Sequence, residues 1–204
     1  QLDTILAGTD HDEETPLLLL CRLENIGLDD TAKARLVLAS QSPRRREILD
    51  MMMLQGKYTV ETPPLDEGKA QRDLSVSAIS PEEYTRKLAE AKAFSLAESH
   101  RDEKNVGDKP TANIPVFYLG SDTIVEIDNK ILEKPKDLED AKTMLSLMSG
   151  RQHHVHTGVA LFKLMGHEIT LISSFTDTAT VTFCNLSKET INAYVATGEP
   201  LDKA

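Results

Sequence analysis

Arg35-Leu-Val-Leu-Ala-Ser-Gln-Ser-Pro-Arg-Arg-Arg-Glu-Ile-Leu49 is the stretch around which the rest of this 204-residue chain is organised. Its first part, residues 36–39, is a short apolar run that predicts a buried strand. Ser42 and Pro43 follow, and this pair predicts the start of a helix. Serine is a favoured N-cap, and proline suits the first helical position because its missing N–H would have no partner there.

Three arginines, Arg44, Arg45 and Arg46, occupy the first turn of this predicted helix. The positive end of a helix dipole disfavours cations, so the cluster needs a reason. Free backbone N–H groups, two serine hydroxyls and three guanidinium groups together would bind a polyphosphate. The alternative interpretation is a basic, solvated helix start.

Composition limits the remaining classes of protein. A hydrophobic content of 40% and a charged content of 27% are typical of a soluble globular protein of one large or two small domains. The formal net charge of -10 argues against a general nucleic-acid binder or a membrane-surface binder, which are usually basic. The cluster of three arginines is therefore a local exception to the acidic character of the chain.

Cysteine usage and hydropathy indicate the compartment. Cys21 and Cys184 are far apart and form no CxxC pair, which favours a reduced, intracellular setting over a disulfide scaffold or a zinc site. The longest apolar run, residues 16–20, is too short to span a bilayer, and the first residues do not resemble a signal peptide. We therefore expect a cytoplasmic protein without a membrane partner.

Two acidic residues follow a short predicted strand at residues 57–61. Two prolines force the chain out of the sheet after that strand, which would place Asp66 and Glu67 on a loop beyond a strand end. Sites are commonly built at such positions. The alternative is an exposed acidic loop.

A capping box at residues 80–83 predicts a strong helix start. Its buried stripe carries Tyr84, Leu88 and Leu96, and Lys92 falls on the same stripe. Such a lysine either extends to solvent along its aliphatic stem or points into a cleft and meets an anion. Residues 99–115 are polar and are predicted to form a loop.

Asp122 is the strongest catalytic candidate on local grounds. It follows Gly120 and separates two predicted strand runs, residues 116–119 and 124–127. An aspartate among apolar strand residues is costly unless it is paired or binds a cation. The alternative is an aspartate in a turn or bulge. Asp128-Asn129 then predicts a hairpin turn.

The rest of the chain is predicted to be structural. Asp137 caps a helix, residues 153–164 and 168–184 form a long hairpin, and Ser187 caps a last helix. His154 and His156 would share one face of their strand and His153 the other, so a metal role is not favoured. Walker A, GxGxxG, GxSxG and HExxH patterns are all missing, which leaves the arginine turn as the phosphate site.

Several motifs in order resemble the Maf family of nucleotide pyrophosphatases, the septum formation inhibitor homologues. They are Leu38-Ala-Ser-Gln-Ser-Pro-Arg-Arg-Arg-Glu-Ile-Leu49, Gly120-Ser-Asp-Thr-Ile-Val125, Leu132-Glu-Lys-Pro-Lys136, Leu147-Met-Ser-Gly-Arg151, Val155-His-Thr-Gly-Val-Ala-Leu161 and the late Glu199-Pro-Leu-Asp-Lys-Ala204. The resemblance covers residues 35–204, and residues 1–34 would be an N-terminal extension.

The resemblance implies an α/β fold with a mixed, elongated, curved sheet and two lobes around a central cleft, like that of the Maf and ITPase-like proteins. It implies a house-cleaning enzyme that cleaves a nucleoside triphosphate to the monophosphate and pyrophosphate. Mg²⁺ or Mn²⁺ would be the cofactor and a homodimer the assembly. Asp122 matches the family's catalytic base, and Glu67 with Asp122 would hold the metal. The implied substrate-binding residues are Ser42, Arg44, Arg45, Lys92, Thr123 and Lys134, of which Arg44 and Thr123 match positions tied to substrate selection.

The motifs resemble the branch of the family that prefers dTTP and UTP, since the tryptophan usual after Ser-Pro in the 7-methyl-GTP branch is replaced by Arg44. Family members continue past the Lys-Ala motif to a glutamine that takes part in specificity, so we expect the C-terminal end to be truncated at Ala204. The rival function is a nucleotide-binding regulator of cell division without turnover. Retention of Glu67 and Asp122 favours hydrolysis.

Overall fold

The computed structural model describes residues 34–77, 79–104 and 114–202. The predicted N-terminal extension therefore lies outside the described residues except for Ala34, which packs in the core. In chain order the elements are β1 (Arg35–Ala39), α2 (Pro43–Met51), β2 (Tyr58–Glu61), α3 (Glu67–Ser75), α4 (Pro81–Lys104), β3 (Val116–Ile127), β4 (Lys130–Leu132), α5 (Leu138–Met148), β5 (Gln152–Met165), β6 (Glu168–Thr182), α6 (Lys188–Ala196) and the short 3₁₀ helix η1 (Glu199–Asp202).

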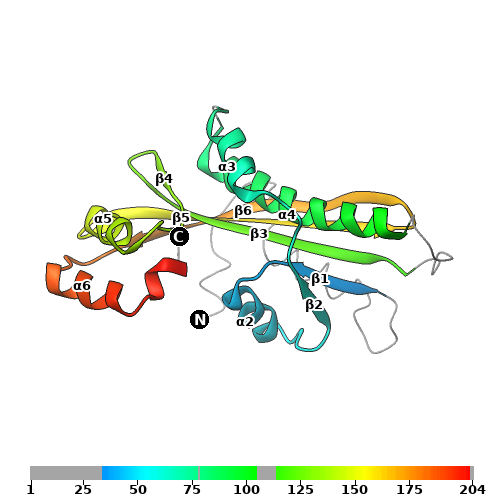
Figure 1. The fold of residues 1–204 in the computed structure, drawn as a ribbon, viewed down its shortest axis with the longest axis horizontal. Helices are drawn as coiled ribbons and strands as arrows, with labels where there is room; N and C mark the ends of the chain where they lie inside the picture. Colours follow the sequence, from blue (N-terminus) through cyan, green and yellow to red (C-terminus); the bar gives the residue numbers. More distant parts are fainter. Residues whose placement is uncertain (1–33, 78, 105–113, 203–204) are drawn as a thin grey trace, which may run out of the picture.

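Within the described ranges six strands form one mixed sheet in the order β2-β1-β3-β5-β6, with β4 also paired to β3. β1 is parallel to β2 and β3, whereas β3, β5 and β6 are antiparallel neighbours. The sheet is elongated because β3, β5 and β6 contain 12, 14 and 15 residues. Figure 1 shows α4 along these long strands, α2 beside β1 and β2, and α5 with α6 at the far end. This is the predicted mixed α/β architecture.

One edge of β3 is left partly uncovered, and this gap positions the site. β5 pairs with β3 from Val116 to Glu126. On the other edge β1 pairs with residues 116–119 and β4 with residues 125–127. Residues 120–124 therefore have no strand neighbour on that edge among the described elements. Side chains from both faces of β3 can reach the space beside this edge. The segments that follow β1 and β4 can reach it too.

α4 packs against β3 and β5 at unusually short range. A Cβ atom on Gly120 would lie 2.2 Å from the backbone oxygen of Ala89, and one on Gly158 would lie 2.3 Å from that of Thr85. α4 presents small residues at this interface, including Ala89 and Ala93, both fully buried. Glycine is needed at the two strand positions because any side chain there would push the helix away from the sheet.

The predicted loop at residues 99–115 is wrong in its first part, because α4 continues to Lys104. The polar composition of these residues suits an exposed helix as well as a loop, and ion pairs from Arg101 to Glu98 and Asp102 support the last turns. His100 also lies 2.9 Å from the Tyr118 hydroxyl and 2.9 Å from a Glu61 carboxylate oxygen. Residues 105–113 lie outside the described ranges.

The predicted loop at Asp66 and Glu67 is also corrected. Asp66 is the N-cap of α3 and accepts a hydrogen bond from the Lys69 N–H at 2.9 Å, and Glu67 begins the helix. Gly68 obscured this helix in the sequence, since glycine is a poor helix former. Likewise β3 is one continuous strand, in which Asp122 pairs with Gly158, so Asp122 lies in neither a turn nor a bulge.

Other predicted elements are confirmed. Asp128 and Asn129 have φ values of 53° and 59° in the hairpin turn between β3 and β4. Asp137 and Ser187 cap α5 and α6 through hydrogen bonds to the N–H groups of Asp140 and Thr190. No described helix combines the length and the apolar character that are needed to cross a membrane.

We predict that Gly158→Ala lowers the free energy of unfolding by about 3 kcal/mol, because the added methyl group would overlap the α4 backbone. Urea denaturation would measure the change. Gly68→Ala in α3 is the control, since its nearest neighbour is the end of the flexible Arg72 side chain at 3.3 Å. That variant should be unchanged or stabilised by up to about 1 kcal/mol. Equal stability of Gly158→Ala and the wild type would contradict the packing argument.

Candidate active site

A cleft of about 790 Å³ lies at the uncovered edge of β3. Its walls come from the turn between β1 and α2, the end of β2, the first half of α3, α4, the centre of β3, the segment after β4, and β5. All eight residues predicted for the site line it, although they come from five separate parts of the chain: Ser42, Arg44, Arg45, Glu67, Lys92, Asp122, Thr123 and Lys134. The structure thus brings the predicted residues together, and their chemical roles stay predictions.

The centre of the cleft is an ion-paired group of three side chains. The Lys92 ammonium lies 2.6 Å from Asp122 Oδ1 and 3.3 Å from Glu67 Oε2. Lys92 and Asp122 are buried, with 6% and 9% of their surfaces exposed, whereas the Glu67 side chain is half exposed. Of the two alternatives for Lys92, the structure therefore shows the inward one. The ammonium reaches the sheet because α4 approaches β3 so closely.

Burial is the largest influence on Asp122, and it raises the pKa of the carboxyl group above its usual range. The nearby Lys92 and Arg45 lower this pKa, and the negative charge of Glu67 raises it further. A carboxylate whose pKa lies closer to neutrality is a stronger base than an ordinary surface aspartate. Asp122 can therefore accept a proton from a water molecule in the cleft.

The turn between β1 and α2, together with Arg44 and Arg45 at the start of α2, forms another wall of the cleft. Ser40 is buried, and its hydroxyl oxygen accepts hydrogen bonds from Arg45 Nη1 at 2.9 Å and from the Ser42 N–H at 3.1 Å. Ser42 is the N-cap residue as predicted, but its side chain makes no capping hydrogen bond, and the first turn contains no acidic residue. The positive end of α2 is thus not neutralised by its own side chains, which suits an anion.

The three arginines differ in position. Arg44 and Arg45 line the cleft, whereas Arg46 is exposed and outside it. Ile48 also lines the cleft and is 50% exposed, and Met53 is 82% exposed. The helix thus buries little of its own surface: α2 ends at Met51, and Leu49 is its buried residue.

Thr123 and Lys134 complete the predicted set. Thr123 points to the face of β3 opposite Asp122, and its Oγ1 lies 3.2 Å from Thr157 Oγ1 on β5. Both faces contribute because this edge of β3 is uncovered. Lys134 is exposed on the segment after β4.

The cleft is also lined by polar residues that were not predicted for the site, among them Ser40, Gln71, Glu133 and Thr157. Ser40 belongs to the quoted Ser-Gln-Ser segment, so a signal for it was present. Gln71 lies on α3, which was not predicted as a helix. Glu133 and Thr157 belong to two of the quoted motifs, so the resemblance marked their segments, but neither stands out by local rules, since one follows a strand end and the other lies within a strand.

The predicted metal ligands, Glu67 and Asp122, fit a hard cation in their chemistry. Mg²⁺ is usually held by one or two carboxylates together with substrate phosphates and water. Within the described ranges no group of three or more His, Cys, Asp or Glu side chains is arranged to hold a metal ion. The two carboxylates instead share the Lys92 ammonium. These residues can therefore provide two carboxylate ligands, and the substrate would have to provide the others.

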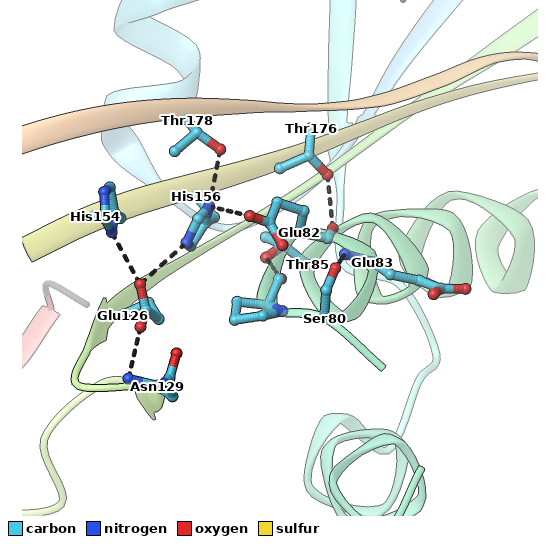
Figure 2. Close-up of polar contacts among 11 residues, drawn as sticks. Ser80, Glu82, Glu83, Thr85, Glu126, Asn129, His154, His156, Thr176 and Thr178 are labelled. Atoms are coloured by element: carbon cyan, nitrogen blue, oxygen red, sulfur yellow. Dashed lines mark hydrogen bonds and ion pairs between the residues drawn. The ribbon is translucent and has the colours of Figure 1, made fainter. Parts of the chain in front are cut away.

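His154 and His156 on β5 belong to a different cluster, which Figure 2 shows, and neither histidine lines the cleft. His154 and His156 share a face, as predicted. Both approach Glu126 Oε2, at 2.9 Å and 3.9 Å, and His156 Nδ1 lies 2.9 Å from Thr178 Oγ1. Glu82 at the start of α4 is 3.9 Å from the same ring. This cluster joins α4 to the strands and contributes no side chain to the cleft.

Comparison with known proteins gives a family and several relatives that share one name. A family model described as Maf-like protein matches residues 35–204. A protein of Bacillus cytotoxicus named dTTP/UTP pyrophosphatase is 39% identical over 171 residues, which cover 83% of this chain and 75% of that protein. Proteins with the same name from Vibrio cholerae and Symbiobacterium thermophilum are 40% and 39% identical over 172 and 174 residues, covering 78% and 74% of their own lengths.

We predict that Arg45→Ala weakens binding of inorganic tripolyphosphate about tenfold or more, because this guanidinium group is held in the cleft by Ser40. Isothermal titration calorimetry would measure the affinity. Arg46→Ala is the matched control, since it removes the same charge from an exposed position outside the cleft, and its affinity should change by about twofold or less. Equal small losses in both variants would instead support a solvated helix start.

Proposed function

The chain belongs to the Maf family, and from this membership we propose that it is a nucleoside triphosphate pyrophosphatase that hydrolyses dTTP and UTP to the monophosphate and pyrophosphate. The observation that carries the proposal is one cleft in which the buried Asp122–Lys92 pair faces Arg44 and Arg45. Phosphoryl transfer depends mainly on positioning and on neutralising charge, and a cleft with basic walls and one buried carboxylate supplies both.

In the proposed mechanism Asp122 orients a water molecule and accepts its proton as the water oxygen attacks phosphorus. The attacked atom is the α phosphorus, the bond that breaks joins it to the oxygen that bridges to the β phosphate, and the departing pyrophosphate keeps that oxygen and the electron pair. Arg44, Arg45 and Lys134 balance the negative charge of the triphosphate and of the leaving group. Lys92 keeps Asp122 ionised in its buried position and ready to act as the base.

We further propose that Glu67 and Asp122 hold Mg²⁺ or Mn²⁺ when substrate binds. A bound divalent cation would neutralise charge on the phosphate oxygens. The homodimer and the cytoplasmic location stay predictions that rest on resemblance and composition.

We predict that Asp122→Asn lowers kcat for dTTP by at least about 100-fold, because asparagine cannot accept the proton. The amide oxygen can still accept a hydrogen bond from Lys92, so we expect the variant to fold. Pyrophosphate release would measure turnover, and thermal denaturation would check folding. Asp128→Asn is the control, since Asp128 lies in an exposed hairpin turn and pairs with Arg151 outside the cleft. If kcat of Asp122→Asn stays within a few-fold of the wild-type value, Asp122 is not the general base.

We also predict that dTTP and UTP give the highest kcat/KM in a panel with ATP, GTP, ITP and 7-methyl-GTP. A site that hydrogen-bonds a base edge discriminates strongly, because a wrong base leaves buried polar groups without partners. Pyrophosphate and nucleoside monophosphate should appear in equal amounts. A preference for ITP or 7-methyl-GTP would overturn the branch but not the reaction. Release of inorganic phosphate alone would overturn the cleavage position, and binding without any release would support the regulatory alternative.

A further inference from the structure

Tyr84 makes a buried contact with the cleft wall although it does not line the cleft itself. It lies in the first turn of α4, has 2% of its surface exposed and packs against Leu88 and Ile124. Its hydroxyl group donates a short hydrogen bond to Glu133 Oε1. Glu133 follows β4 and lines the cleft beside Lys134. The contact thus joins the helix to the segment that forms one wall.

The chemistry of this contact is fixed by its surroundings. Burial raises the pKa of the Tyr84 phenol, and the Glu133 carboxylate raises it further. The phenol therefore stays protonated at physiological pH and acts as a donor to the carboxylate. A hydrogen bond from a neutral donor to a charged acceptor in a partly dry site is stronger than an ordinary one.

The wall is attached to the sheet by a short strand, whose Ile131 and Leu132 pack partly buried against two core clusters. β4 contains three residues and pairs only with the end of β3, and Glu133 is the first residue beyond it. Tyr84 and Lys92 stand two helical turns apart on one stripe of α4, with Leu88 between them. The same helix face therefore holds the wall through Tyr84 and the central carboxylates through Lys92.

The charge on Glu133 gives this contact a consequence for substrate. A carboxylate that is released from its anchor within the cleft can approach the phosphates or compete with them for the basic side chains, and like charges in one site repel. We propose that Tyr84 is a positioning residue: its hydroxyl holds the Glu133 carboxylate against α4, which keeps that negative charge from the phosphates and fixes the wall that carries Lys134. This inference rests on the proposed function, because it assumes a triphosphate substrate.

Steady-state kinetics with dTTP would test the inference on Tyr84→Phe, Glu133→Gln and the double variant. We expect Tyr84→Phe to raise KM about tenfold while kcat changes by about threefold or less. Glu133→Gln removes the charge that Tyr84 restrains, so the double variant should recover most of the lost affinity. Such rescue would not follow if Tyr84 only stabilised the fold. Wild-type KM in Tyr84→Phe, or a double variant no better than Tyr84→Phe, would overturn the proposal.

Tyr118→Phe is the matched control. Tyr118 is equally buried, and its hydroxyl group also joins β3 to α4, through His100, but it does not line the cleft. Its KM should stay within about twofold of wild type. If the wild type releases no pyrophosphate from dTTP, the proposed function fails. Calorimetric binding of tripolyphosphate to the same four variants then tests the positioning role, which requires the same loss in Tyr84→Phe and the same rescue in the double variant.

Discussion

The close contact of α4 with β3 and β5 is the constraint on which the cleft depends. Gly120 and Gly158 remove the side chains that would separate the helix from the sheet. At this distance Lys92 on the helix reaches Asp122 on β3, with 2.6 Å between Nζ and Oδ1. Two positions without any functional group therefore determine the geometry of the charged ones.

The buried charges at the centre are tolerated because they are paired. Taking a carboxylate and an ammonium out of water costs several kcal/mol for each ion unless they contact one another. Glu67 remains half exposed, so one side of the group still faces solvent. A buried pair with an open side is a costly arrangement for stability alone. It is expected where the charges serve a ligand that enters from that side.

Much of the fold could be predicted from the sequence because local patterns and final structure agree. The caps at Asp137 and Ser187 and the turn at Asp128 rest on chemistry within a few residues. The polar turns at the end of α4 and the glycine-containing α3 could not be predicted in this way. The last turns of α4 also have tertiary partners that no local pattern reveals, since His100 contacts Tyr118 and Glu61.

In the site, too, some residues could be predicted from local sequence and others could not. Arg44, Arg45 and Asp122 were predictable because each is out of place by local rules: cations at the positive end of a helix, and an acid inside a buried strand. Their convergence in one cleft follows from the pairing of β1 and β4 with different parts of β3, which no local pattern reveals. Glu133 had no such signal, since its significance depends on a tyrosine 49 residues earlier in the chain.

The uncovered stretch of β3 also bears on strand pairing between separate chains. An exposed strand edge offers unpaired backbone groups to any other extended chain and is a common start of aggregation. Here the open stretch, residues 120–124, is only five residues long, and β1 and β4 close it at both ends. A foreign strand would have to fit between these two and bring its backbone beside the buried charge of Asp122. The short opening is therefore a poor template for pairing with another extended chain.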